Sequence, residues 1–360
     1  MQIGQPGEGH MKRALTAAGV TAVTALAAAG CASSSASTGG SGSAGNPLVL
    51  RLGFLTNITH APALIGIEKN YFSKALGKNV KLEIHPFSTG TEEGTALLAG
   101  QLDAAYVGPN PTIKAWQTSD GKLIKVISGA ASGGAALVVK KGITTPAQLK
   151  GQKLASPSLG NTQDVALRYW LKKNQLTSTQ SGGGDVPITP ITPNSAAVLQ
   201  FKSGQIAGGW EPAPYDIEMV QDGGHMLVNE ASLWPKGQFV TTNLVVTQKF
   251  LSAHKSAVNG LLKGQIQANN YIHSNPSGAQ AAANKELTSL LGKGLDPSVL
   301  SASFKEITFT NNPIASSLAT DAQHAVSVGL LTPVKNISVL YQLGPLNAQL
   351  KAAGQSQVKS

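Results

Sequence analysis

The sequence predicts an α/β protein of two lobes, each built on a mostly parallel sheet. A length of 360 residues favours about two globular domains. Strand-like segments alternate with helix-like segments from residue 47 onward, which is typical of parallel sheets joined by helices. A weak repeat also indicates two related halves. NITHAPA at Asn57 and GQLDAAYVGP at Gly100 have counterparts 104 residues further on, NTQDVA at Asn161 and GQIAGGWEP at Gly204.

The first 30 residues differ in composition from the rest of the chain. Lys12 and Arg13 follow a second methionine, Met11, and precede an uncharged run from 14 to 29. A basic start, a short apolar stretch and small residues before a cysteine are typical of a secretory signal peptide. We therefore expect residues 1–30 to be a signal peptide, with translation beginning at Met11, and the remainder to act outside the cytoplasm.

The signal ends in AAAGC, at the only cysteine of the chain, Cys31. This motif resembles the lipobox of bacterial lipoproteins, which implies that Cys31 is lipidated and anchors the protein to the cell membrane. A plain secretory signal with an unmodified cysteine is the alternative. Residues 31–46 are almost all small and predict a flexible tether. The globular body is expected to begin near Pro47.

The elements of the first lobe are predicted in order along the chain. Strands are expected at 49–57 (VLRLGFLTN), 80–87 (VKLEIHPF) and 102–108 (LDAAYVG), because apolar residues there alternate or form a short buried run. Helices are expected at APALIGIEKNYF, after the first strand, and at TEEGTALLAG, which Gly100 ends in a C-cap position.

Two later strands, AALVVKK (135–141) and TNLVVTQKF (242–250), are best suited to carry the chain between the lobes. The tail from 310 to 350 predicts mainly helices, packed on the first lobe. The expected division is therefore a first lobe of residues 47–140 and 238–350 and a second lobe of residues 141–237.

Composition and motifs argue against several classes of function. The net charge is +10, but no dense run of Lys and Arg occurs, so nucleic acid is not an expected partner. The body contains no HExxH, no GxSxG and no P-loop, and its histidines lack metal-ligand spacing. Asp164 and Arg168 are spaced to support a helix. We expect neither an enzyme nor a cofactor or metal site.

Loops rich in Gly, Asn, Thr and Ser instead follow the predicted strands. In open α/β sheets ligands bind beyond the carboxyl ends of strands, where helices begin. A helix N-terminus carries about half a positive charge and unpaired N–H groups, so it binds an oxyanion without a full cation. Asn110 is expected to cap a helix whose first turn holds Pro111. The candidate ligand-binding residues are Asn57, Thr59, His60, Gly108, Pro109, Asn110, Ser132, Gly133, Gly134, Gly160, Asn161, Thr162, Gln163, Trp210 and Glu211.

Several of these residues have a purely structural alternative. The stretch SLGNTQDVALRYW is either a helix cap with more polar residues than a cap needs, or an anion site. In the second case Asn161, Thr162 and Gln163 face Asn57–His60 across a cleft. Trp210 fits equally a contact with an aliphatic part of a ligand and the core. Glu211 would repel an anion, so we expect it to pair with a cation, either a Lys or Arg of the protein or an amine of the ligand.

Five segments resemble the solute-binding components of ABC importers for sulfonates, taurine and nitrate. They are RLGFLTNITHAPALIGIEKNYF, LLAGQLDAAYVGPNP, GNTQDVALRYWL, SGQIAGGWEPAP and WPKGQFVTTNLVV. The resemblance extends from Val49 to Gly329. It implies a two-lobed periplasmic-binding-protein fold of type II with two crossing strands, and a monomer that closes over a small anion. It also implies delivery of that anion to a membrane permease with its ATPase.

The expected ligand is an aliphatic sulfonate or taurine; nitrate, bicarbonate and a thiamine or riboflavin precursor are alternatives. One departure from the family bears on this choice. Relatives often carry an acidic residue after GQI and a W-x-P-E-P-W pattern, whereas this chain has Ala207 and WEPAPY, with Ala213 at the usual glutamate. An interaction or signalling protein that reuses the fold is the remaining alternative.

Overall fold

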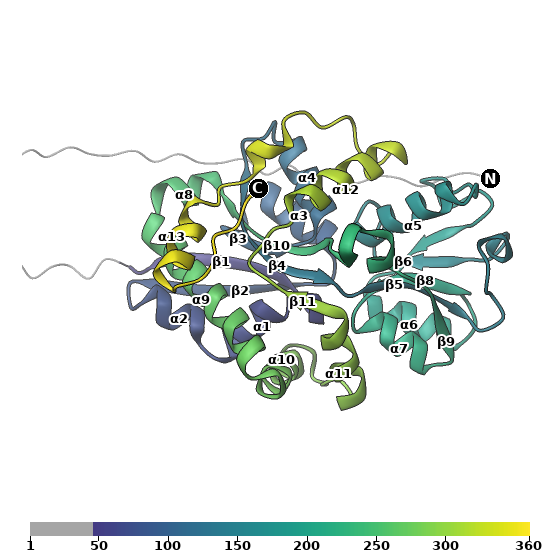
Figure 1. Cartoon of the computed structure of the whole chain (residues 1–360), viewed down its shortest axis with the longest axis horizontal. Coiled ribbons are helices and arrows are strands. Elements are labelled where there is room, and N and C mark those ends of the chain that lie inside the picture. Colours follow the sequence, from purple (N-terminus) through teal and green to yellow (C-terminus); the bar gives the residue numbers. More distant parts are fainter. Residues whose placement is uncertain (1–45) are drawn as a thin grey trace, which may run out of the picture. The chain divides into compact units, whose positions relative to one another are not determined.

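Two β-sheets with helices on both sides make up residues 46–360, the part of the chain that the structure, a computed structural model, describes (Figure 1). The predicted signal peptide, Cys31 and all of the predicted tether except Asn46 lie outside the described residues. No helix within residues 46–360 combines the length and the apolar character needed to cross a bilayer.

The first sheet has six strands. Its three parallel strands are β2 (Val80–Phe87), β1 (Leu48–Leu55) and β3 (Ala104–Val107), with β1 in the middle. Beside β3 lies β10 (Val240–Thr247), followed by β4 (Ile124–Gly133) and β11 (Ile307–Phe309), each antiparallel to its neighbour.

The second sheet repeats this plan. Its parallel strands are β7 (Ile188–Pro190), β6 (Leu154–Ser156) and β8 (Gly208–Pro212), and β5 (Ala135–Lys140) and β9 (Gly224–Asn229) continue it antiparallel. The sequence repeat is therefore also a structural repeat. The starts of α3 (Gly90–Leu98) and α6 (Asn194–Lys202) are 104 residues apart, and so are the starts of β3 and β8. Both sheets are mixed rather than mostly parallel, because β10 and β5, which follow the crossings between lobes, run back against the parallel strands.

The remaining helices connect and cover the strands. They are α1 (Ala61–Glu68), α2 (Tyr71–Leu76), α4 (Pro109–Thr118), α5 (Thr162–Lys173), α7 (Tyr215–Gln221), α8 (Gln248–Ala253), α9 (Lys255–Ser274), α10 (Pro276–Leu291), α11 (Pro297–Glu306), α12 (Ala315–Ser327) and α13 (Gly344–Ala352). Short 3-10 turns lie at η1 (Ile58–His60), η2 (Pro146–Leu149), η3 (Glu230–Leu233), η4 (Pro235–Gly237) and η5 (Ile337–Leu340). The tail after 310 is mainly helical, as expected, but α12 packs on α5 as well as on α4.

The chain crosses between the sheets at two points that differ from the expected ones. The first crossing is the turn from β4 to β5 at Gly133 and Gly134, so residues 135–140 belong to the second lobe rather than the first. Both glycines have positive φ, and a Cβ on Gly133 would lie 2.5 Å from the carbonyl oxygen of Glu306. The second crossing is not a strand: the chain returns through η3 and η4 before β10 begins.

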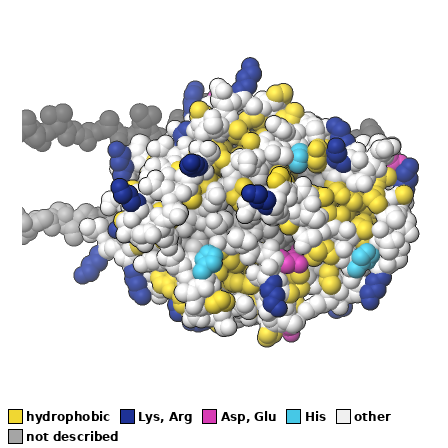
Figure 2. Space-filling view, viewed as in Figure 1, with side chains coloured by type: hydrophobic (Ala, Val, Ile, Leu, Met, Phe, Trp, Pro, Cys, Tyr) yellow, Lys and Arg dark blue, Asp and Glu magenta, His cyan; other side chains and the backbone are white. Residues whose placement is uncertain are grey.

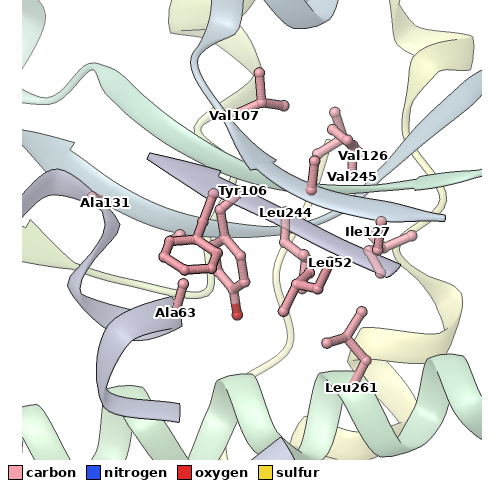
Figure 3. Packing of buried hydrophobic residues seen from close by; sticks show 14 of the residues in the cluster. Leu52, Ala63, Tyr106, Val107, Val126, Ile127, Ala131, Leu244, Val245 and Leu261 are labelled. Atoms are coloured by element: carbon pink, nitrogen blue, oxygen red, sulfur yellow. The ribbon is translucent and has the colours of Figure 1, made fainter. Parts of the chain in front are cut away.

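The first sheet carries the larger core. Leu52, Tyr106, Ile127 and Leu244 come from four different strands and pack together above α9, which contributes Leu261 (Figure 3). The second sheet has one apolar cluster on each face, the larger one containing Trp170 and Trp210. Each lobe is therefore stabilised by its own core, and the loops between strands and helices are free to form a site.

Candidate functional site

A cavity lies between the two sheets, where the parallel strands of both lobes end. Its walls are mostly neutral and polar, with apolar contributions from a leucine and three prolines. The lining residues are Leu55, Asn57, Thr59, His60, Ser88, Thr89, Gly90, Gly108, Pro111, Pro157, Asn161, Thr162, Gln163, Asn194, Pro212 and Thr241. The enclosed space is about 20 Å³, which is room for about one water molecule, so the lobes lie closed on each other.

Four helices and one 3-10 turn begin at this cavity. Their N-terminal residues in the lining are Asn57 before η1, Thr89 before α3, Gly108 before α4, Asn161 before α5, and Asn194 at the start of α6. No Lys, Arg, Asp or Glu contributes to the lining. The positive ends of the helices therefore dominate the electrostatics of the cavity.

The N-terminus of α5 carries both a cap and free donors. Asn161 Oδ1 accepts the N–H of Asp164 at 2.9 Å, so this residue is the cap. The N–H groups of Thr162 and Gln163 find no hydrogen-bond partner among residues 46–360. Since both residues line the cavity, two unpaired donors are available at its second-lobe wall.

His60 supplies a neutral donor from the first lobe. Its Nδ1 accepts the N–H of Leu55 at 3.1 Å, and burial lowers the pKa of the imidazole to about 3. The ring is therefore uncharged at neutral pH, and its single proton is on Nε2. Beside it, Thr59 Oγ1 donates to Asn57 Oδ1 at 2.7 Å, which fixes the turn before α1.

Direct contacts between the lobes surround the cavity. A Cβ built on Gly108 would lie only 2.6 Å from Thr162 Oγ1. Thr91 and Ser158 share a hydrogen bond of 2.8 Å between their hydroxyl oxygens, and the N–H of Ile58 donates to the carbonyl oxygen of Ala213 at 3.2 Å. Closing the lobes thus depends on small residues and backbone groups at the contact.

Seven of the expected residues line the cavity, namely Asn57, Thr59, His60, Gly108, Asn161, Thr162 and Gln163. Gly160 lies just outside it, where its N–H donates to Asp164 Oδ2 at 2.9 Å. Asp164 is also paired with Arg168 at 2.8 Å in a fully buried ion pair, as their spacing indicated. The loop before α5 is therefore held from behind by a buried charge pair.

The expectation for Asn110 was wrong. The residue that caps α4 is Gly108, with Pro109 as the first helical residue. Asn110 is already inside the helix, and its Nδ2 donates to the carbonyl oxygen of Asp321 at 3.4 Å. The helix begins two residues earlier than the Asn-Pro pattern indicated, and neither Pro109 nor Asn110 lines the cavity.

Ser132, Gly133 and Gly134 form the first crossing rather than a wall of the cavity. Ser132 Oγ accepts the N–H of Phe239, and the N–H of Gly133 donates to the carbonyl oxygen of Phe239, both at 3.3 Å. The carbonyl oxygen of Gly134 accepts the N–H of Ala213 at 2.9 Å. Ser132 and Gly133 thus join the first crossing to the second, and Gly134 joins it to the end of β8.

Trp210 is a core residue. Its ring is fully buried against Trp170, and its Nε1 donates to Glu230 at 2.7 Å. Because side chains alternate along a strand, the next residue of β8, Glu211, points to the opposite face of the sheet. Both side chains therefore lie outside the cavity.

Glu211 has no Lys or Arg partner among the described residues, so of the two expected cations, a protein side chain or an amine of the ligand, the first is ruled out there. Its Oε2 accepts the amide N–H of Asn194 at 2.7 Å, and its Oε1 is buried without a partner in that part of the chain. Burial raises the pKa of this carboxyl well above its ordinary value, which favours its uncharged form. In that form, the acid next to Asn194 does not repel an anion in the cavity.

Five polar or glycine residues of the lining were not anticipated: Ser88, Thr89, Gly90, Asn194 and Thr241. Two signals were present in the sequence. Thr89 and Glu92 form the T-x-x-E capping box directly after a predicted strand. Asn194 follows Gly90 by 104 residues, the register of the repeat. Thr241 carries no local signal, because only the pairing of β10 with β3 and β4 brings it to the site.

No group of three or more metal-ligating side chains lies close together in residues 46–360. In the cavity, His60 Nδ1 accepts a hydrogen bond from the backbone N–H of Leu55. The chemistry that the cavity offers is therefore hydrogen bonding from neutral donors on two walls.

A two-lobed fold with a polar cavity between mixed sheets is that of the periplasmic binding proteins of ABC import systems. The alkanesulfonate-binding protein of Xanthomonas axonopodis pv. citri, solved with MOPS, has a TM-score of 0.68 at 18% identity over 83% of this chain and 99% of that one. The nitrate-binding protein of Synechocystis PCC 6803 has a TM-score of 0.66 at 14% identity over 86% of this chain and 89% of that one.

The chain belongs to the NMT1-like family, whose model matches residues 43–287. A relative in sequence is the taurine-binding periplasmic protein of Escherichia coli, which is 26% identical over 248 residues, covering 64% of this chain and 73% of that protein. A putative binding protein of Brucella abortus is also 26% identical, over 234 residues that cover 63% of this chain and 68% of the relative.

Proposed function

We propose that this protein is an extracytoplasmic solute-binding protein that captures a small organosulfonate between its lobes and delivers it to an ABC-transporter permease. The observation that carries the proposal is the convergence of helix N-termini from both lobes on a cavity without charged walls. It acts by binding and not by catalysis. Family membership and the taurine-binding relative support the same function.

An oxyanion suits this cavity better than a cation or a neutral ligand. The free N–H groups of Thr162 and Gln163 and the Nε2–H of His60 are all donors, and the helix ends add partial positive charge. A sulfonate offers three acceptor oxygens, so one group can bind donors of both lobes. Only a ligand that contacts both lobes stabilises the closed state.

Among organosulfonates, the lining favours an uncharged tail over the ammonium group of taurine. No carboxylate lines the cavity, and Glu211, which is bound to the lining residue Asn194, has a pKa that burial raises well above its ordinary value. Apolar atoms are available from Leu55, Pro111 and Pro157. A short aliphatic sulfonate is therefore the preferred ligand; taurine, nitrate, bicarbonate and a thiamine or riboflavin precursor are the alternatives.

The proposal includes location and partners. Residues 1–30 would direct export, and lipidated Cys31 would hold a monomer at the outer side of the cell membrane through the tether. The permease and its ATPase would then receive the ligand from the closed protein. Mass spectrometry of the protein purified from membranes tests this part, since a diacylglyceryl group on Cys31 is the expected modification.

Isothermal titration tests the ligand. The purified protein is titrated with ethanesulfonate, pentanesulfonate, taurine, nitrate, bicarbonate and sulfate under one buffer condition. We expect an alkanesulfonate to bind at least about tenfold more tightly than taurine or sulfate. If nitrate or bicarbonate bound most tightly, that ion would take the place of the sulfonate as the proposed ligand. The absence of heat and of a thermal shift with all of these ligands would overturn the proposal.

A further inference from the structure

Five lysines lie at one end of the strands of the first sheet, the end away from the cavity. They are Lys78, Lys122, Lys125, Lys249 and Lys255, and we call this group the lysine end. The cavity lies beyond the carboxyl ends of β1 and β3, whereas these lysines lie where β2 and β4 begin and β10 ends. Figure 2 shows Lys and Arg side chains along the left side of the body, where β1 begins in Figure 1.

Hydrogen bonds and a shared groove connect these segments. The N–H of Leu48 donates to the carbonyl oxygen of Asn79 at 2.9 Å, which places Lys78 beside the start of β1. The N–H of Gln248 donates to the carbonyl oxygen of Leu123 at 2.8 Å, which places Lys122 and Lys249 on neighbouring segments. Lys125 and Lys255 line one surface groove together with Gln248.

The charge at this end is not neutralised by the acids of the described residues. Lys78, Lys122, Lys249 and Lys255 are exposed, and none of the five lysines takes part in an ion pair within residues 46–360. Asp103 is occupied by Arg51 at 2.8 Å, which leaves Asp120 as the nearby acid in this stretch. The lysine end therefore carries a net positive charge that faces solvent.

We propose that the lysine end binds the surface of a membrane that contains anionic lipids. Charge complementarity is the first argument, because lysines near such a surface add to its affinity one by one. The second argument is where the chain enters: Asn46 and Pro47 lead into β1 at this same end. This step rests on the proposed lipid anchor at Cys31, fifteen residues before Asn46.

Tether length makes the contact effective. A chain of that length spans at most about 50 Å, so an anchored body stays close to the bilayer. Attraction between the lysines and lipid headgroups then orients the body with the lysine end on the membrane. The cavity lies at the opposite end of the strands and faces away from the membrane. The protein can therefore capture its ligand before it engages the permease.

Co-sedimentation with vesicles tests the proposal on the full chain. Vesicles of phosphatidylglycerol and phosphatidylcholine are compared with vesicles of phosphatidylcholine alone, at about 0.1 and 0.5 M salt. We expect preferential binding to the anionic vesicles at low salt. The triple variant K78E/K122E/K249E should bind them at least about tenfold more weakly, because three attractive charges become repulsive.

The second lobe offers a matched control. Lys140, Lys141 and Lys153 are equally exposed at the corresponding edge of the second sheet, so K140E/K141E/K153E changes the net charge by the same amount. This control should keep at least half of the wild-type binding. An equal loss in both triple variants, or unchanged binding of K78E/K122E/K249E, would overturn the proposal.

Ligand titration of the same variants keeps the two proposals separate. K78E/K122E/K249E should bind sulfonate as the wild type does, since none of its changes touches the cavity. Absence of sulfonate binding in the wild type would remove the proposed ligand and leave the vesicle result unaffected.

Discussion

Gly108 lies where the two lobes touch inside the cavity, and its lack of a side chain permits that contact. A Cβ at this position would come within 2.6 Å of Thr162 Oγ1, far closer than atoms pack. The φ of Gly108 is −66°, so alanine adopts this backbone without strain in an open protein. The residue therefore matters for closure and not for the fold of either lobe.

We predict that G108A lowers ligand affinity at least about tenfold while its thermal midpoint without ligand changes by less than about 2 °C. The physical reason is that the added methyl group keeps the lobes apart. Isothermal titration and differential scanning calorimetry measure the two effects. G142A is the matched control, because Gly142 has open space around it. Wild-type affinity in G108A would show that the contact is irrelevant to binding.

Glu230 gives the protein a pH dependence. Burial raises the pKa of this carboxyl to about 7, while it accepts a hydrogen bond from Trp210. The folded pKa is above the ordinary 4.5, so its contribution to stability is full below about pH 4.5 and is lost as pH rises through about 7.

We predict that the unfolding free energy of the wild type decreases between pH 5 and pH 8 by about 2 kcal/mol more than that of E230Q. Glutamine is uncharged throughout and keeps an oxygen for Trp210. Urea unfolding at the two pH values measures the difference. E83Q, at a half-buried site on β2 in the other lobe, should retain the wild-type slope. A parallel pH dependence in E230Q and the wild type would contradict the assignment.

At the scale of the element, the N-terminus of α5 combines a structural and a binding role. Asn161 caps the helix and also lines the cavity, and the two roles differ in their tolerance of charge. Aspartate is as good a cap as asparagine and is favoured by the helix dipole. A negative charge in the cavity, however, opposes an oxyanion. A single substitution therefore separates the two roles.

We predict that N161D preserves or raises the thermal midpoint and lowers affinity for the anionic ligand at least about a hundredfold. N161S, a neutral cap, should keep stability within about 0.5 kcal/mol and lose much less affinity. Thermal unfolding and titration are measured on both variants. Equal affinity of N161D and N161S would reduce this helix start to a simple cap.

At the scale of the whole molecule, closure also depends on contacts far from the cavity. α12 packs on α4 of the first lobe and on α5 of the second. Between α12 and α5, the rings of His324 and Tyr169 stack with centroids 3.6 Å apart. The Nζ of Lys172 donates to the carbonyl oxygen of Ser327 in the same contact. The tail thus joins the two lobes without lining the cavity.

We predict that H324A lowers ligand affinity about three- to tenfold, because it removes a stacking contact worth roughly 0.5–1.5 kcal/mol that exists between the lobes only when they are closed. Titration measures the affinity, and small-angle scattering without ligand should report a larger radius of gyration. H254A is the control, because the ring of His254 contacts Phe250 within the first lobe. An affinity of H324A equal to that of H254A would argue against this role for α12.

Local patterns were sufficient for much of the architecture. The alternation of strands and helices predicted the α/β class, and the repeat at Asn57 and Asn161 predicted two halves with one plan. That plan appears in the common order of β2-β1-β3 and β7-β6-β8. Placing loops at the carboxyl ends of parallel strands also brought seven of the expected residues to one cavity. These features depend on periodicity and on short segments, which a sequence displays directly.

Tertiary structure decided which of those loops face the cavity. Asn110 points to α12, Ser132 pairs with the second crossing, and Trp210 enters the core, in each case through contacts with residues far away in the chain. Thr241 reaches the site only because β10 pairs between β3 and β4. The sequence by itself determined the elements and the repeat; long-range packing determined the site, because no local pattern records which distant segments meet.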